Sequence, residues 1–187
     1  MNDLIKKQLS EAQTNMDKAV AHCESELTKI RAGKASAGML DGIMVEYYGT
    51  PTPLAQVGSI NTPDARTIVI QPWEKNMLSP IERAIMEANI GINPQNDGSI
   101  IRLLVPPLTE ERRKELVKKS KEEGERGKVA IRNIRKDANE KIKKLKAESV
   151  SDDEIKVGEA EVQKITDSYI IKIDRHIEAK EKDIMTV

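Results

Sequence analysis

Hydrophobic residues recur every three or four positions along three long segments of the chain, and this spacing is that of one face of an α-helix. The first segment covers residues 2–30 and approximates a heptad repeat, which predicts packing of the coiled-coil type. The second covers residues 109–146 and contains no proline. The third begins at Ser151, which forms a capping-box pattern with Glu154, and runs toward the C-terminus. We therefore expect three long amphipathic helices.

The second of these helices carries small residues on its hydrophobic face. Ser120, Gly124 and Gly127 fall on the same stripe as its aliphatic residues. Glycine inside a helix costs about 1 kcal/mol relative to alanine, so close contact with a bulky partner is expected to offset that cost. We expect this partner to be Met16 of the first helix or Tyr169 of the third.

The hydrophobic period changes to two between Ile43 and Tyr48, which predicts a half-buried strand. Tyr47 and Tyr48 could also form a platform for stacked bases, although alternating strand residues more often belong to the core and the surface. Further short strands are expected at 55–60, 66–71 and 100–105, with turns at 49–53 and 93–98.

A shorter helix is expected inside this middle region. Ser79 is the expected cap, Pro80 the first helical position and Glu82 the partner in a capping box, and the helix should stop near Gly91. Together with the strands, this helix makes residues 31–105 a small α+β domain.

None of the three long helices can bury its hydrophobic face alone, so they are expected to pack together. Residues 1–30 and 106–187 then form a discontinuous three-helix bundle, and residues 31–105 are inserted between its first and second helices. Two connectors, at 31–34 and 105–108, join the two parts. The predicted fold class is α+β: a long three-helix bundle with a small inserted β/α/β domain in a hinged L shape.

The composition suits long exposed helices. Charged residues make up 33% of the chain and aromatic residues 2%, and phenylalanine is absent, so the core is expected to be aliphatic. The single cysteine, Cys23, excludes a disulfide framework and is expected to be a small buried hydrophobe. No hydrophobic run approaches the length of a membrane span, and charges stand where a signal peptide would have its apolar core. We expect a soluble cytoplasmic protein.

The sequence contains no recognisable catalytic constellation. It has no metal-ligand spacing, no glycine-rich phosphate loop and no nucleophile motif. The two histidines, His22 and His176, lie on different helices. We therefore expect no enzymatic activity, no cofactor and no metal site.

Charge is distributed unevenly, and the second long helix is basic. Residues 109–146 hold fifteen Lys and Arg against eight Asp and Glu, although the whole chain is neutral. Lys121, Lys128, Arg132 and Arg135 form a row beside the hydrophobic face. A basic stripe on an otherwise acidic body is typical of nucleic-acid binding, and the scarcity of aromatic residues favours recognition of structured RNA by its shape and backbone.

Two alternatives compete with RNA binding. The basic row could be the solvated face of a structural coiled-coil protein, or the chain could be an RNA-modifying enzyme with a helical arm. The lack of a catalytic cluster argues against the second. The third long helix is acidic, with eleven Asp and Glu against six Lys and Arg from residue 147 onward, which suits a position next to the basic helix.

Five segments carry a resemblance to one family. They are KIRAGKA at 29–35, VEYYGTPTPL at 45–54, GINP at 91–94, PPLTEERRK at 106–114 and IRNIRKDA at 131–138. On these segments the chain resembles bacterial ribosome recycling factor along essentially its whole length. The resemblance implies a three-helix bundle with an inserted β/α/β domain, joined by a hinge and shaped like a transfer RNA.

The resemblance also implies a function. A ribosome recycling factor binds the post-termination 70S ribosome across the A and P sites of the large subunit. With elongation factor G and GTP hydrolysed by that partner, it splits the subunits, so that messenger RNA and deacylated transfer RNA can leave. It is not an enzyme, and we expect a monomer.

Residue roles follow from the matching motifs. Arg132 is expected to be the leading contact to ribosomal RNA, supported by Arg135, Lys128 and Arg31, and Lys121 extends the basic row. The expected hinge residues are Arg31, Ala32, Gly33, Val105, Pro106 and Pro107.

Overall fold

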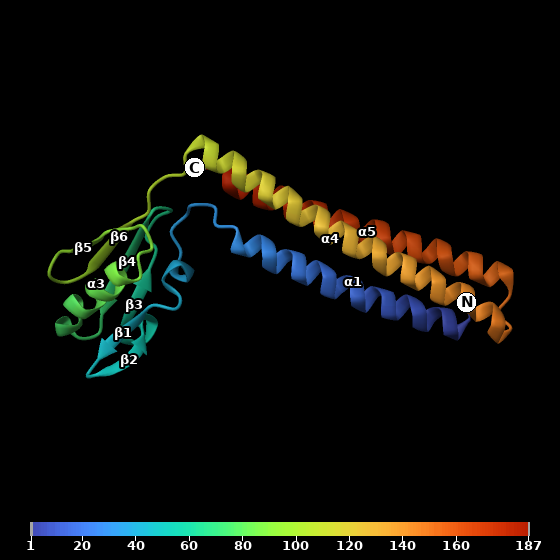
Figure 1. The fold of residues 1–187 in the computed structure, drawn as a ribbon, viewed down its shortest axis with the longest axis horizontal. Coiled ribbons are helices and arrows are strands. Elements are labelled where there is room, and N and C mark those ends of the chain that lie inside the picture. The colour runs from blue at the N-terminus through green and yellow to red at the C-terminus, as the bar shows by residue number, and fades with distance from the viewer. Residues whose placement is uncertain (1, 187) are drawn as a thin grey trace. The chain divides into compact units, whose positions relative to one another are not determined.

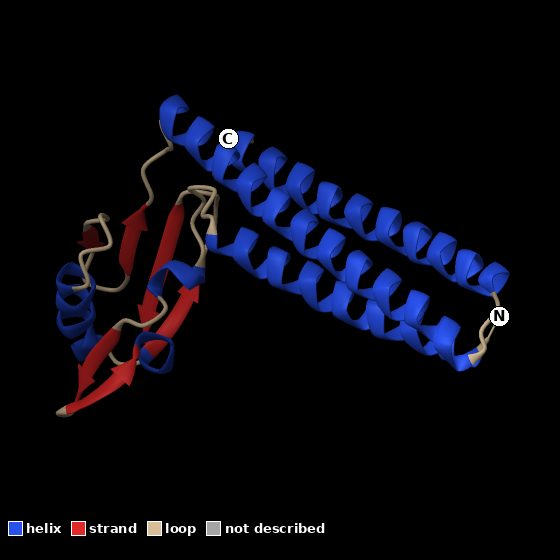
Figure 2. Ribbon diagram, turned by 45° about the vertical axis from the view of Figure 1, so that its right-hand side comes forward, coloured by secondary structure: helices blue, strands red, loops and turns tan. Residues whose placement is uncertain are grey.

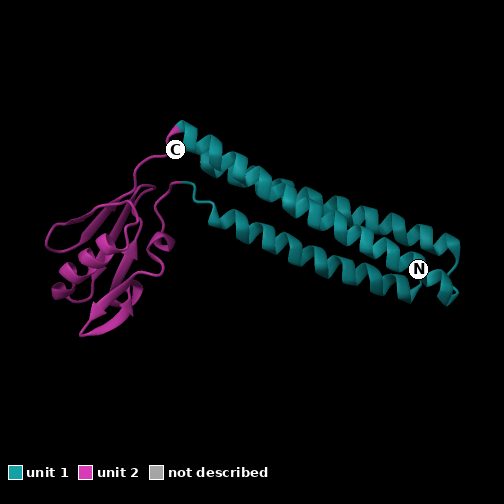
Figure 3. Ribbon diagram, in the orientation of Figure 1, with its two compact units in different colours: residues 1–32, 110–187 teal, residues 33–109 magenta. Residues whose placement is uncertain are grey.

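The structure is a computed structural model that describes residues 2–186. It divides into two compact units (Figure 3): a helical unit, residues 1–32 and 110–187, and a sheet unit, residues 33–109. The sheet unit is continuous in the sequence, whereas the helical unit combines segments from the two ends of the chain. The predicted α+β class, with a long helical bundle and a small sheet domain, is confirmed.

Three long helices form the helical unit: α1 (Asp3–Lys29), α4 (Glu110–Lys144) and α5 (Asp152–Met185). They run side by side (Figures 1 and 2), and each contacts the other two. α4 continues into a short 3-10 helix, η3 (Leu145–Glu148), after which Ser149 adopts a left-handed φ of 64°. These helices follow the spans expected from the hydrophobic spacing.

Capping side chains fix the starts of two helices. The Asn2 side chain accepts a hydrogen bond from Leu4 N at 2.9 Å, and Ser151 Oγ accepts one from Glu154 N at 3.3 Å. The Ser151 hydroxyl also donates to the Glu154 carboxylate at 3.4 Å. These bonds satisfy amide groups that have no partner in the first turn of a helix. The cap expected at Ser151 is therefore present.

Two glycines of α4 allow the other helices to approach it closely. A Cβ atom added to Gly124 would overlap the side chain of Ile177 on α5. One added to Gly127 would lie 3.0 Å from Cys23 Sγ on α1 and 3.2 Å from Ile173 Cδ1 on α5. Cys23 is buried against Gly127 and is a packing residue, as expected, and burial also raises the pKa of its thiol.

The expectation that Met16 or Tyr169 covers these glycines is wrong. Tyr169 directs its hydroxyl toward α1, where it donates to Asp17 Oδ1 at 2.6 Å. Burial, the hydrogen bond to Asp17 and the negative charge of Asp17 together raise the pKa of Tyr169 to about 12. Met16 is fully buried but is not among the nearest neighbours of either glycine. Cys23 of α1 and Ile173 and Ile177 of α5 fill that space instead.

Six short strands within the described residues form two antiparallel sheets. β1 (Met44–Tyr47) and β2 (Thr50–Pro53) make a two-stranded ribbon. The other sheet has the order β3-β4-β6-β5, formed by β3 (Gly58–Asn61), β4 (Thr67–Pro72), β5 (Pro94–Asn96) and β6 (Ile101–Leu104). The helical elements of this unit are η1 (Ala37–Leu40), α2 (Leu54–Val57), η2 (Lys75–Met77) and α3 (Leu78–Glu87).

The core of the sheet unit is aliphatic. Alternate residues of β4 and β6 point into it, because successive side chains of a strand face opposite sides. α3 packs against β1 and β5 and adds its own hydrophobic face. The fully buried members are Val45, Ile68, Ile70, Ile81, Ile85, Ile101 and Leu103.

Two segments that the sequence predicts to be turns contain strands. In the ribbon, the register pairs Met44 with Pro53 and Glu46 with Pro51. Leu54 N donates to Ile43 O at 3.1 Å, so the next pair, Met44 with Pro53, and the pair of Glu46 with Pro51 are non-hydrogen-bonded, and both prolines face the outer edge and remove no bond from the ladder. β5 is also an edge strand, and it begins with Pro94 inside the second of these segments.

Two further expectations for this unit are corrected. α3 begins at Leu78, and its cap position is Met77 with no side-chain hydrogen bond, so Ser79 is not the cap. η2 leads directly into α3 and supplies helical backbone where a polar cap would otherwise stand. Segment 55–60, expected to be one strand, is divided between α2 and β3.

Gly127→Leu is expected to lower the free energy of unfolding by about 1–3 kcal/mol, because the added side chain must displace Cys23 and Ile173 in a filled core. Urea unfolding measures this change. The control is Ala160→Leu, which places the same side chain at an exposed position of α5. An unchanged midpoint for Gly127→Leu would show that this position does not face the core.

Alkaline titration tests the bond between Tyr169 and Asp17. A tyrosine whose folded pKa is about 12 contributes stability that is present below pH 10 and is lost as the pH rises from about 10 to about 12. Tyrosinate absorbance should therefore show a late component that Tyr169→Phe removes, while Tyr47, whose pKa is raised by its hydrogen bond to Glu74, titrates late in both proteins. The same substitution should cost about 1 kcal/mol at neutral pH. Ordinary titration of every tyrosine near pH 10 would contradict the bond.

Candidate nucleic-acid interface

The outer face of α4 carries an arginine that no internal group engages. Arg132 is exposed, and within residues 2–186 no hydrogen bond or ion pair occupies its side chain. The N–H groups of a guanidinium without an internal partner are available to bind two oxygens of a phosphate or carboxylate ligand. Helical spacing places Val129, Asn133 and Lys136 on the same side of α4, and all three are exposed.

Lys136 was not among the residues selected from the sequence. It lies one helical turn after Arg132, is exposed, and has no partner among the described residues. The signal that could have found it was present, because positions i and i+4 of a helix share a face. Arg132 and Lys136 thus form a pair of uncompensated positive charges on one face.

Lys128 differs from Arg132 because acidic groups hold it. Its Nζ lies 2.5 Å from Asp174 Oδ1 on α5 and 3.4 Å from Glu125 Oε1 on α4. Only 16% of its side chain is exposed. The hydrogen bond to Asp174 is the largest of the effects that raise the pKa of Lys128, so its charge is retained but already paired.

The remaining two members of the basic row also reach α5. Lys121 Nζ lies 3.7 Å from Glu181 Oε1 in an exposed pair. Arg135 is half-buried and donates from Nη1 to Gln163 Oε1 at 3.4 Å. Gln163 in turn donates to Asp167 at 2.8 Å, which orients the amide beneath the guanidinium. In the basic row, Lys121, Lys128 and Arg135 therefore have partners on α5, whereas Arg132 has none among the described residues.

The expected hinge residues differ in their surroundings. Arg31 is exposed and Ala32 half-buried, and Gly33 has a left-handed φ of 72°. A Cβ on Gly33 would overlap Leu108, so the two connecting segments touch within the sheet unit. Glycine suits this position for both reasons.

The second connecting segment begins inside the sheet core. Val105 is buried, and its N–H donates to Arg66 O at 2.7 Å, which extends the pairing of β4 with β6. Pro106 and Pro107 are exposed, and neither can donate a backbone hydrogen bond. Val105 is thus fixed to the sheet unit, whereas the two prolines follow it as a segment without ladder bonds.

The described part of the chain offers no candidate metal site and no candidate membrane span. Among residues 2–186, no three His, Cys, Asp or Glu side chains gather in a way that could hold a metal ion. No helix there is long and apolar enough to cross a membrane. The basic face of α4 remains the strongest candidate site of the helical unit.

Comparison with known proteins decides the family. A model described as ribosome recycling factor matches residues 23–185. The chain belongs to the ribosome recycling factor family. The ribosome-recycling factor of Cytophaga hutchinsonii is 55% identical over 179 residues, which cover 96% of each protein. That of Porphyromonas gingivalis is 54% identical over 184 residues, covering 98% of this chain and 99% of the relative.

Solved structures of ribosome recycling factors are similar in fold. A solution structure of a ribosome recycling factor has a TM-score of 0.72 and 41% identity, with full coverage of both chains. A second neighbour is described as a model of the T. thermophilus ribosome recycling factor and E. coli elongation factor G bound to the E. coli post-termination complex. It has a TM-score of 0.61 and 44% identity, and the match covers 97% of this chain and 99% of that one.

Membership in this family confirms the resemblance drawn from the sequence motifs. Ribosome recycling factors are translation factors and not enzymes, so the chain is a non-enzymatic component of protein synthesis. The roles of individual basic residues stay predictions, and the structure arranges them into free and paired positions that can be tested separately.

Asp174→Asn is expected to strengthen binding to large-subunit ribosomal RNA, because it releases Lys128 from its closest partner. One additional phosphate contact should steepen the dependence of log affinity on log salt by about one. Filter binding at several salt concentrations measures both effects. Adding Lys128→Met to this variant should abolish the gain. If affinity and slope do not change, Lys128 does not face the RNA.

Proposed function

We propose that this ribosome recycling factor acts on the post-termination 70S ribosome. It binds ribosomal RNA of the large subunit and, with elongation factor G and GTP hydrolysed by that partner, separates the subunits so that messenger RNA and deacylated transfer RNA leave. The observation that carries the proposal is the uncompensated guanidinium of Arg132 on the open face of α4. The neighbour described with elongation factor G on a post-termination complex supports the choice of target and partner.

The contact with RNA is electrostatic in this proposal. Arg132 binds a phosphate through two parallel N–H groups, and Lys136 supplies a point charge one turn away. Arg135, Arg31, Lys128 and Lys121 support the contact. Lys128 and Lys121 contribute less than Arg132, because carboxylates of α5 already neutralise them. The exposed residues around Arg132 include no aromatic ring, so phosphate recognition takes precedence over base stacking.

Movement between the two units provides the mechanical step. The sheet unit swings about residues 31–33 and 105–107 when elongation factor G acts on it, while α4 remains bound to RNA. Gly33 supports this role because it adopts a left-handed φ, which glycine reaches more easily than other residues. Pro106 and Pro107 support it because neither can donate a backbone hydrogen bond to the sheet. The factor works as a monomer in the cytoplasm, where ribosomes are found.

Subunit splitting followed by light scattering tests this function directly. The wild-type chain should lower the scattering of post-termination ribosomes only when elongation factor G and GTP are both present. Arg132→Ala should weaken binding to the large subunit by about 1.5–3 kcal/mol, the range for a hydrogen bond to a charged group, and should slow splitting at limiting factor.

Arg126→Ala is the matched control for this experiment. It removes the same charge from the same helix, but Arg126 is already paired with Glu123 at 2.6 Å. Its affinity should stay close to that of the parent. Equal losses for the two variants would mean that only net charge matters. Unaltered affinity of Arg132→Ala in a pelleting assay would remove the proposed contact.

A further inference from the structure

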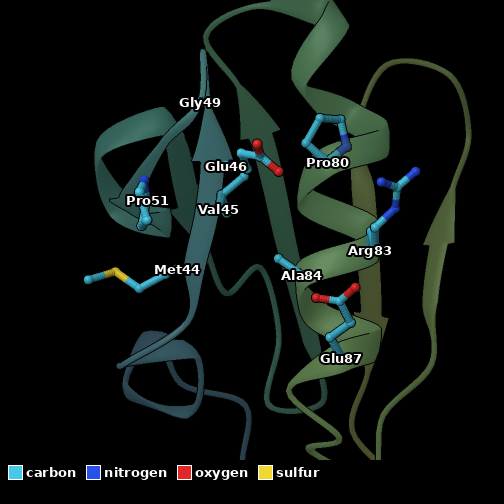
Figure 4. Close-up of a pocket in the computed structure, with 9 residues that line it drawn as sticks. All are labelled: Met44, Val45, Glu46, Gly49, Pro51, Pro80, Arg83, Ala84 and Glu87. Atoms are coloured by element: carbon cyan, nitrogen blue, oxygen red, sulfur yellow. The ribbon is translucent and has the colours of Figure 1, made fainter.

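A groove in the sheet unit takes no part in the proposed RNA contact. It is lined by β1 and α3 and also by Gly49 and Pro51 of the β1–β2 ribbon, and it has a volume of about 620 Å³ (Figure 4). The β1 wall includes Met44, Val45 and Glu46, and the α3 wall includes Arg83, Ala84 and Glu87. Three consecutive residues of one strand line it, so the backbone of β1 forms part of the wall as well as its side chains.

The backbone of β1 has a free hydrogen-bonding edge on this side. The register pairs Met44 and Glu46 with the two prolines of β2, which cannot donate, so these are the non-hydrogen-bonded pairs of the ladder. The hydrogen bond from Leu54 N to Ile43 O, at 3.1 Å, makes the preceding pair, Ile43 with Leu54, a hydrogen-bonded one, as this alternation requires. The N–H groups of Met44 and Glu46 therefore point away from β2, and no hydrogen bond within residues 2–186 engages them.

α3 packs against β1, and within residues 2–186 no strand other than β2 pairs with β1. Figure 4 places the proline-containing strand on one side of β1 and α3 on the other. An unpaired strand edge beside a groove is the arrangement in which a protein accepts an added strand from a partner. β1 spans four residues, so an added strand of about that length would match it.

The charged groups of the groove are also unpaired. Glu46 on β1 and Glu87 on α3 stand on opposite walls, and neither has an ion-pair partner in the described chain. Arg83 lies one turn before Glu87, a favourable spacing for a pair, yet no ion pair joins them. The groove also offers apolar surface: Ala84 on the α3 wall and, on the side of Pro51, Met44, of which 56% is exposed (Figure 4).

We propose that the groove between β1 and α3 binds an extended basic segment of a partner protein, which adds as a third strand to the β1–β2 ribbon. Main-chain groups of the segment pair with Met44 and Glu46. Its Lys or Arg side chains lie on the side of Glu46, reach Glu46 and Glu87, and lay their methylene groups along Met44, whereas its alternate apolar side chains point to the side of Val45, toward Ala84. Two carboxylates against the single guanidinium of Arg83 leave the groove net negative, which disfavours the phosphates of a nucleic acid. This proposal rests on the sheet unit alone and is independent of the proposed function.

A short peptide of the required chemistry is the probe. The acetylated, amidated peptide Lys-Val-Lys-Val-Lys is titrated into the full-length chain labelled with nitrogen-15. We expect saturable shifts of the amide signals of Met44 and Glu46 and of residues 83–87, with slower hydrogen exchange at the two β1 amides. No saturable shift in this group, or shifts confined to the helical unit, would overturn the proposal.

Two comparisons separate strand addition from general attraction between charges. Glu46→Lys combined with Glu87→Lys should raise the dissociation constant about tenfold, because two ion pairs are replaced by repulsion. The control, Glu140→Lys with Glu148→Lys, makes the same change of charge on exposed residues of the helical unit and should leave the constant unchanged. Equal effects of the two double variants would refute a site in the groove.

The last comparison tests the main-chain contact. A peptide of the same sequence in which every backbone nitrogen is methylated keeps the charges but cannot donate to a strand edge. It should lose the shifts at Met44 and Glu46. Equal binding by this peptide would overturn strand addition, and equal binding by the acidic peptide Glu-Val-Glu-Val-Glu would overturn selection by the acidic walls.

Discussion

Burial of three aliphatic stripes against one another is the constraint on which the rest of this molecule depends. α1 supplies one stripe near the N-terminus, and α4 and α5 supply the others after the sheet unit. An isolated amphipathic helix would leave its stripe in water, and helical propensity alone would not compensate. The bundle can therefore close only through contacts between distant parts of the chain, and the sheet unit must fold as an insertion whose two ends return to the bundle.

The same packing distributes the charge of the bundle. α5 is acidic and lies along α4, and ion pairs join the two helices at Lys121–Glu181, Lys128–Asp174 and Lys143–Glu159. Ion pairs at a protein surface contribute only about 0–1 kcal/mol each, so the greater effect of these pairs is on the charge of the surface. They remove positive charge from the side of α4 that faces α5 and leave it uncompensated around Arg132. A polyanion would therefore meet a narrower basic surface than the composition of α4 suggests.

The long helices could be predicted from the sequence because their periodicity extends over many turns, whereas the prolines of β2 misled the prediction. A proline excludes a strand only when its nitrogen faces a neighbouring strand, and that side is known only once the partner and register are known. The exposure of Arg132 followed from its angular position on one helix. The pairing of Lys128 with Asp174 did not, because it depends on how α5 is rotated against α4.

The close packing at Gly127 of α4 also determines the position of an ion pair between α4 and α5. Because Gly127 lacks a Cβ, Ile173 of α5 can lie against the α4 backbone. The residues that follow these two in the sequence, Lys128 and Asp174, form the shortest ion pair between the helices. Gly127 and Ile173 make the close contact, and the next residue of each helix makes the ion pair. A larger side chain at Gly127 would therefore separate the two helices and also move Asp174 away from Lys128. The basic surface is thus a property of the bundle and not of α4 alone.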